Sequence, residues 1–220
     1  MRKTFLGLGV LVTIMMGCSL SNAATTSIPA PLSDEPLATQ PVPDKELIVA
    51  GGCFWGIEAV FLHVKGVKNA VSGYAGGEES TATYDQVSSG KTNHAEAVKI
   101  TYDSSKVTMG QLLQVFFGVA HNPTELNKQG PDHGTQYRSA VFYEDENQRK
   151  FVENYIEQLD QGKHFEDKIV TALEPLQKFY PAETYHQNYV AFHPDSFYVM
   201  IHDAPKLIAL EDTFPNLYEK

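Results

Sequence analysis

A short apolar run that ends at two glycines, with a helical pattern directly behind it, restricts how this chain can fold. Residues 47–50 read Leu-Ile-Val-Ala, as a buried strand does, and Gly51 and Gly52 end the run. Apolar side chains at helical spacing then follow through residues 53–64, up to the glycine at position 66. The pattern predicts a strand, a glycine turn and a helix, with Cys53 at the helix start.

The remaining patterns continue this order of elements. Further strands are predicted at residues 67–75, 95–102 and 139–143, and helices behind Thr108 and over residues 144–159. The order up to residue 143 is therefore β-α-β-β-α-β, which predicts an α+β fold: a ferredoxin-like two-layer sandwich. Two long connections, 77–93 and 121–137, are rich in polar and aromatic residues, so we expect them to carry substrate contacts.

Charge and cysteine content exclude several classes of function. The chain has 17 basic and 27 acidic residues, a net charge of −10 that disfavours nucleic acid as a partner. Two cysteines cannot form a disulfide framework, and no CxxC or HExxH spacing occurs. The eight histidines show no ligand spacing, so we expect no metal site and no bound cofactor.

The first 45 residues differ in composition from the rest. Residues 1–23 combine a basic start, an apolar run and small residues before a cleavage point, which predicts a signal peptide and export to the periplasm or medium. Cleavage before Cys18 is the alternative, because Met15-Met16-Gly17-Cys18 loosely resembles a lipobox and would give a lipid-anchored envelope form. The proline-rich stretch 24–45 predicts a solvated linker, and 46–220 the catalytic domain.

Cleavage after residue 23 would remove Cys18, and lipidation would block its thiol. Cys53 would therefore be the only free cysteine in either form. At a helix start, unpaired N–H groups and the positive end of the helix dipole favour a thiolate, so we expect a lowered pKa. A buried and inert cysteine is the alternative. Two aromatic residues, Phe54 and Trp55, follow directly; beside a nucleophile they could bind a methyl group on sulfur, although core packing is the usual role of such residues.

The pentapeptide Gly52-Cys53-Phe54-Trp55-Gly56 resembles the signature of the A-type peptide methionine sulfoxide reductases. Four further blocks resemble that family in the same order. They are Gly-Tyr-Ala-Gly-Gly at 73–77, His-Ala-Glu-Ala-Val at 94–98, Asp-His-Gly-Thr-Gln-Tyr-Arg-Ser at 132–139 and Tyr-His-Gln-Asn-Tyr at 185–189. The resemblance covers residues 47–194, and the family also has a ferredoxin-like core.

The resemblance implies a role for each matching residue. Cys53 would attack the sulfoxide sulfur of the S epimer, and Glu96 would protonate the departing oxygen. The hydroxyls of Tyr84 and Tyr137 would hydrogen-bond that oxygen. Phe54 and Trp55 would hold the substrate methyl group, and Asp132 would order the site and bind substrate. The products would be methionine and a sulfenic acid on Cys53. Taken alone, Glu96 could equally be a solvent-facing strand carboxylate.

The chain departs from many family members after Cys53, because no later cysteine can attack the sulfenic acid. The resemblance therefore implies an external reductant, a thioredoxin-like or glutaredoxin-like protein or a small thiol, and methionine-sulfoxide-containing proteins as substrates. A cysteine hydrolase or acyltransferase is one alternative, although no histidine base can be identified and His186 is interpreted as a structural hydrogen-bonding residue. A non-catalytic secreted binding module is the other alternative. The sequence does not decide whether the tail after Pro205 packs on the core or covers the site.

Overall fold

A computed structural model describes residues 28–220 of the chain. The predicted signal peptide, Cys18 and the first residues of the proline-rich stretch lie outside the described residues, so those predictions stay untested. Within residues 28–220, no helix is both long enough and apolar enough to cross a membrane.

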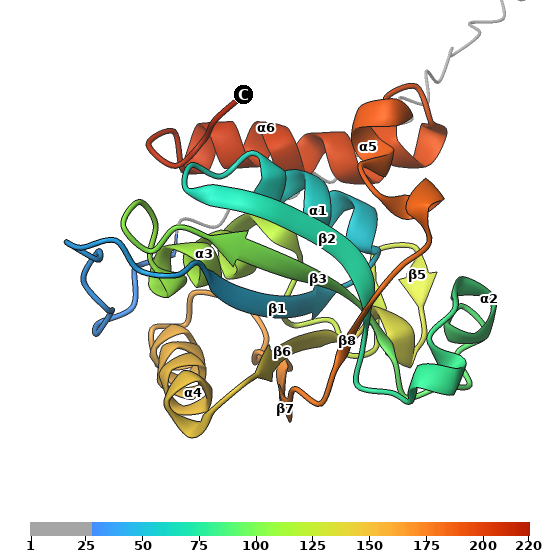
Figure 1. Ribbon diagram of the computed structural model, residues 1–220, viewed down its shortest axis with the longest axis horizontal. Helices are drawn as coiled ribbons and strands as arrows, with labels where there is room; N and C mark the ends of the chain where they lie inside the picture. The colour runs from blue at the N-terminus through green and yellow to red at the C-terminus, as the bar shows by residue number, and fades with distance from the viewer. Residues whose placement is uncertain (1–27) are drawn as a thin grey trace, which may run out of the picture.

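The core of the fold is an antiparallel sheet with helices packed on one face (Figure 1). Its elements, in chain order, are β1 (Lys45–Gly51), α1 (Phe54–Leu62), β2 (Val67–Ala75), β3 (Ala95–Tyr102), α3 (Met109–Val115) and β6 (Ser139–Tyr143). The four strands lie in the order β6-β1-β3-β2, and every neighbouring pair is antiparallel. This arrangement confirms the predicted α+β sandwich with β-α-β-β-α-β connectivity.

Alternation along β1 separates two apolar cores. Leu47 and Val49 are buried in the large core that contains the inner sides of α1 and α3. Ile48 and Ala50 point to the opposite face, where they join a smaller core with Phe142. Because successive strand residues face opposite sides, a strand that is buried on both faces reads as the continuous apolar run seen in the sequence.

Two short strands extend the sheet beyond the four predicted strands, and the helix α4 follows β6. β7 (Ala172–Pro175) pairs in parallel with β6, and β8 (Phe179–Pro181) pairs antiparallel with β2. The helix α4 (Glu146–Gln161) begins two residues later than expected because the Asp145 carboxylate caps it, accepting from the N–H groups of Asn147 and Gln148.

Helix α3 carries the capping box that the sequence predicted. Thr108 Oγ1 accepts from the N–H of Gln111, whose side chain accepts in return from the N–H of Thr108. A π-helical turn, η2 (Phe116–Ala120), continues the helix beyond α3. Phe116 and Phe117 in that turn are fully buried, which explains why their apolar spacing read as part of the same helix.

The two long connections contain short elements and lie at the same end of the sheet as the start of α1 (Figure 1). The first contains the turn η1 (Glu79–Thr81) and the helix α2 (Tyr84–Val87). The second contains the hairpin strands β4 (Lys128–Gln129) and β5 (Asp132–His133), followed by the turn η3 (Thr135–Tyr137).

The C-terminal segment packs on α1, which settles the question left open for the tail. It comprises the turn η4 (Thr184–His186), the helix α5 (Tyr189–Phe192), the π-helical turn η5 (Val199–Asp203) and the helix α6 (Ala204–Thr213). Figure 1 shows α6 lying beside α1, and Leu210 of α6 is fully buried in the large core.

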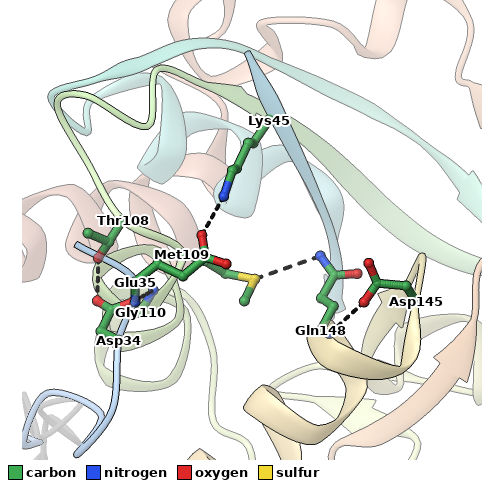
Figure 2. A network of polar contacts seen from close by, with 8 residues as sticks. All are labelled: Asp34, Glu35, Lys45, Thr108, Met109, Gly110, Asp145 and Gln148. Carbon is green, nitrogen blue, oxygen red and sulfur yellow. Dashed lines mark hydrogen bonds and ion pairs between the residues drawn. The ribbon is translucent and has the colours of Figure 1, made fainter. Parts of the chain in front are cut away.

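Residues 28–44 form no helix or strand, but their first part makes specific contacts with the domain. Ile28 is buried in the large core, and its carbonyl accepts from Gln114 Nε2 at 2.8 Å. Asp34 accepts hydrogen bonds from Thr108 Oγ1 and from the N–H of Gly110 at the start of α3, and Glu35 pairs with Lys45 (Figure 2). Only Ile28 of residues 28–35 is buried, and most of the others are exposed, so this part of the stretch is largely solvated but is attached to α3 and β1 at these points.

Candidate active site

Cys53 lies at the N-terminal cap of α1, at the position predicted for it. Gly52, with a φ of +97°, makes the sharp turn out of β1, and a Cβ at this position would lie 2.6 Å from the side chain of Gln129. Cys53 is a free thiol and its residue is 9% exposed. The turn therefore presents the thiol at a nearly closed site beside the end of the sheet.

The Glu96 carboxylate lies at the same helix start. Alternation along β3 puts Glu96 on the face of Val98 and Ile100, which contribute to the large core, and the residue is only 2% exposed. Its Oε2 accepts a hydrogen bond of 3.1 Å from the N–H of Phe54, the residue after Cys53. The interpretation as a solvent-facing strand carboxylate is therefore wrong.

Burial makes Glu96 suited to hold a proton. Loss of hydration raises its pKa from an ordinary value of 4.5 to about 8, and the nearby negative charge of Asp132 adds to this increase. The hydrogen bond from the Phe54 N–H acts in the opposite direction but is outweighed. At neutral pH the carboxyl group is therefore mostly protonated, as a general acid must be.

The expectation of a lowered Cys53 pKa is wrong for this structure. Burial raises the pKa well above that of a free thiol, and the carboxyl groups of Glu96 and Asp203, when ionised, raise it further. The N–H of Trp55 and the ammonium of Lys206 act in the opposite direction. The helix start was predicted correctly. The pKa of Cys53 is nevertheless raised, because loss of hydration has a larger effect than the N–H groups at the helix start, and burial cannot be read from a linear sequence.

Tyr84 and Tyr137 reach the same site from the two long connections. Tyr84 is the first residue of α2, and Tyr137 is the last residue of η3. Burial, followed by the negative charge of Glu96, raises the pKa of both hydroxyls, and the charge of Cys53 raises both as well. The hydroxyls therefore stay protonated near neutral pH and remain available as hydrogen-bond donors.

Asp132 is held in place by a residue that the sequence reasoning did not select. The hydroxyl of Tyr198, in the C-terminal segment, donates to Asp132 Oδ2. The ring edge of Tyr198 also packs against Trp55, with centroids 5.9 Å apart. Tyr198 is one of eleven tyrosines, and its spacing in the sequence carries no signal that distinguishes it from the packing tyrosines.

The two aromatic residues after Cys53 differ in their surroundings. The Phe54 ring is buried, and its centroid lies 5.0 Å from that of His186 and 6.0 Å from that of Tyr74. The Trp55 ring is partly exposed and stacks on Tyr189 at 3.7 Å. Its Nε1–H donates to His186 Nδ1 at 3.1 Å, so His186 orients the indole as a structural residue should.

A charged pair beside α1 was also missed by the sequence reasoning. Lys206 Nζ lies 3.4 Å from Asp203 Oδ1, and both groups lie against Gly56. The Asp203 side chain is fully buried, and its second oxygen, Oδ2, has no hydrogen-bond partner within the described part of the chain. No pattern in the sequence links these residues to Cys53, because they are about 150 positions away.

The arrangement opposes hydrolase chemistry, which needs a histidine base hydrogen-bonded to the thiol. His186 Nδ1 accepts from Trp55, and the two ring nitrogens of His121 face the carbonyl of Phe116 and the hydroxyl of Ser139. Over residues 28–220, no hydrogen bond joins a histidine to Cys53, and no group of three or more His, Cys, Asp or Glu side chains is placed to hold a metal ion.

All seven predicted site residues are thus gathered at one end of the sheet: Cys53, Phe54 and Trp55 at the start of α1, Glu96 on β3, and Tyr84, Asp132 and Tyr137 in the long connections. A buried thiol beside a protonated carboxyl group and two tyrosine hydroxyls provides the groups that a thiol-dependent enzyme with a proton donor requires.

Comparisons with known proteins identify the family. Residues 45–217 match the family model described as peptide methionine sulfoxide reductase. A peptide methionine sulfoxide reductase MsrA 2 from Mesorhizobium japonicum is 55% identical over 173 residues, which cover 79% of this chain and 89% of the relative. One from Synechocystis is 44% identical over 197 residues, which cover 89% of this chain and 92% of the relative.

Solved structures agree with this result. Reduced Mxr1 from Saccharomyces cerevisiae superposes with a TM-score of 0.63 and 34% identity, covering 73% of this chain and 91% of that structure. Methionine sulfoxide reductase A of Corynebacterium diphtheriae gives 0.58 and 32%, covering 74% and 86%. The chain belongs to the peptide methionine sulfoxide reductase family, and its activity is that of a peptide-methionine (S)-S-oxide reductase.

Proposed function

We propose that Cys53 is the nucleophile of this reductase and that Glu96 is its general acid. The observation that carries the proposal is the hydrogen bond from the Phe54 N–H to Glu96, which holds a buried carboxyl group beside the thiol. Because its pKa is about 8, the Glu96 carboxyl group stays mostly protonated near neutral pH and can donate a proton.

The proposed step is balanced as follows. The Cys53 sulfur, as the thiolate, forms a bond to the sulfoxide sulfur, and the sulfoxide oxygen accepts a proton from Glu96. The sulfur–sulfur bond and the substrate S–O bond then break as the protonated oxygen moves to the Cys53 sulfur, which becomes a sulfenic acid, and the substrate leaves as the thioether methionine. The cysteine is oxidised by two electrons, and the sulfoxide is reduced by two.

The remaining site residues act on binding and on the developing charge. The hydroxyls of Tyr84 and Tyr137 donate to the sulfoxide oxygen as negative charge grows on it. The partly exposed Trp55 ring forms the wall that receives the methyl group, and Phe54 supports it from the buried side. Asp132, fixed by Tyr198, orders the rim of the site.

An external thiol returns Cys53 to its reduced form. The chain has two cysteines, Cys18 and Cys53, so no thiol follows Cys53 to form an internal disulfide. The first reductant thiol attacks the sulfenic acid and releases water, and a second thiol resolves the mixed disulfide. Thioredoxin-like proteins, glutaredoxin-like proteins or a small thiol can supply both. Proteins containing methionine sulfoxide are the proposed substrates, and free methionine sulfoxide is a possible second one.

Export is the second part of the proposal. The basic start, apolar run and small residues of positions 1–23 support a signal peptide, so the enzyme would act in the periplasm or outside the cell. The lipid-anchored form, through Cys18, remains the alternative. Fractionation of cells that produce the chain, compared with a variant deleted in 5–16, tests this proposal; retention of both in the cytoplasm would contradict it.

Single-turnover reduction tests the chemistry. Fully reduced protein carrying Cys18→Ser is mixed separately with the S and R epimers of a methionine sulfoxide peptide. We expect about one methionine per enzyme from the S epimer, none from the R epimer, and loss of the Cys53 thiol. The Cys53→Ser variant is the matched control. Methionine formation by that variant would refute the nucleophile assignment.

A further inference from the structure

Acidic side chains outnumber basic ones among the groups that act on the Cys53 thiol. Glu96 on β3 and Asp203 in η5 both raise the pKa of the thiol, and Lys206 on α6 opposes them. The other titratable groups at this end of α1 are Tyr84, His121, Asp132, Tyr137, His186, Tyr198 and His202. His186 is neutral, because its Nδ1 accepts from Trp55 and burial lowers its pKa. A mechanism that needs a thiolate therefore needs a cation here.

Lys206 is positioned to be that cation. Its side chain is 18% exposed, and its Nζ lies 3.4 Å from Oδ1 of Asp203, whose side chain has no exposure. Both charged groups rest on the first turn of α1: a Cβ added at Gly56 would overlap Asp203 Oδ1 and would lie 2.7 Å from Lys206 Nζ. The pair therefore occupies the space that a side chain at position 56 would fill.

The spacing along α1 brings this pair close to the thiol. Cys53 is the N-cap of α1, and Gly56 lies in the first turn of that helix. A group in the place of the Gly56 side chain is thus within about one helical turn of Cys53. Water is largely excluded from this region, so a charge at that distance acts strongly.

Asp203 is arranged as an anchor rather than as one half of a surface ion pair. It is 1% exposed, and its Oδ2 has no hydrogen-bond partner among the described residues. Burying a carboxylate with one oxygen unsatisfied is costly, and an ion pair at this site brings no evident gain in stability. Such a cost is typical of groups that are held for function.

We propose that Lys206 is a positioning residue that stabilises the thiolate of Cys53, and that Asp203 holds the Lys206 ammonium against the first turn of α1. The proposal rests on the assignment of Cys53 as the nucleophile. It assigns to the C-terminal segment, which carries no resolving cysteine in this chain, an electrostatic role in the first step of the reaction.

The test measures thiolate formation without any sulfoxide. The rate of Cys53 alkylation by iodoacetamide is recorded from pH 6 to 10 in the full chain carrying Cys18→Ser. We expect Lys206→Met to lower the rate about tenfold at each pH below the Cys53 pKa, because the loss of one nearby opposite charge reduces the thiolate fraction. Lys206→Arg, which keeps the charge, should react within about threefold of the wild-type rate. Lys65→Met, at a surface site beside the C-terminus, is the control and leaves the profile unchanged.

A double-mutant cycle separates direct action on Cys53 from simple neutralisation of Asp203. Asp203→Asn removes the buried charge, so Lys206→Met in that background leaves no uncompensated carboxylate to disturb folding. The proposal expects Asp203→Asn/Lys206→Met to react at least threefold more slowly at pH 7 than Asp203→Asn alone. Equal rates, with both variants folded by circular dichroism, would overturn it. Because iodoacetamide needs no sulfoxide chemistry, this outcome is independent of the reductase mechanism.

Discussion

Glu96→Gln should remove a pH-dependent loss of stability. The folded-state pKa of Glu96 is about 8, whereas its ordinary value is 4.5, so between these pH values the folded protein binds more protons than the unfolded chain. The unfolding free energy of the wild type must therefore fall as pH rises from 4.5 to 8. A difference of about 3.5 pH units at about 1.4 kcal/mol each gives an upper value of about 5 kcal/mol. Glutamine keeps the acceptor for the Phe54 N–H but cannot ionise.

Urea unfolding at pH 5, 6, 7, 8 and 9 provides the assay. As pH rises from 5 to 9, the unfolding free energy of Glu96→Gln should increase by about 3 to 5 kcal/mol relative to that of the wild type. Most of this increase should occur above pH 6. In single turnover the same variant should reduce the S epimer at least about 100-fold more slowly, because the proton donor is lost. The wild-type rate should fall above pH 8, as Glu96 loses its proton.

Glu46→Gln is the matched control, because Glu46 lies on β1 but its side chain is 39% exposed and pairs with Lys99. Its stability difference from the wild type should be nearly independent of pH. A difference between Glu96→Gln and the wild type that stays constant from pH 5 to pH 9 would refute the argument from burial. Unchanged turnover in that variant would refute the assignment of Glu96 as the acid.

Three further predictions concern other parts of the molecule. Tyr84→Phe and Tyr137→Phe should each slow single-turnover reduction about 10-fold to 100-fold while leaving the melting temperature nearly unchanged, and an unchanged rate in both would contradict their role. Ile28→Ala should lower the unfolding free energy by about 2 kcal/mol or more in urea titration, whereas Leu32→Ala, at a 90% exposed site, should have little effect. Burial lowers the pKa of His121 to about 3, so its contribution to stability should be lost as pH falls from 6.5 towards 3; His121→Asn should flatten that part of the profile.

The order of elements was predictable because each signal is local. The apolar run before Gly51, the capping box at Thr108 and the alternation along residues 95–102 depend on side chains within a few positions of one another. Local patterns could not reveal that Ile28 and Asp34 contact α3, because proline-rich composition describes the backbone preference of the segment and not its long-range contacts.

The candidate site was predictable as a set of residues but not as an electrostatic environment. Cys53 was recognised from its place after two glycines, and the family resemblance supplied Glu96, Tyr84 and Tyr137. The direction of the Cys53 pKa shift was wrong, because it depends on burial and on the carboxylates of Glu96 and Asp203, which reach the thiol only after folding.

The sequence by itself determined the four central strands, the helices α1, α3 and α4, the single thiol that would remain after either cleavage, and the family, since all of these depend on local pattern or on the residues present. Only the tertiary structure decided that Tyr198, Asp203 and Lys206 lie at the start of α1, more than 140 positions from Cys53. The physical reason is that burial and charge act through space. A side chain acquires its pKa and its partners from the residues packed around it, and their distance along the chain has no effect on that environment.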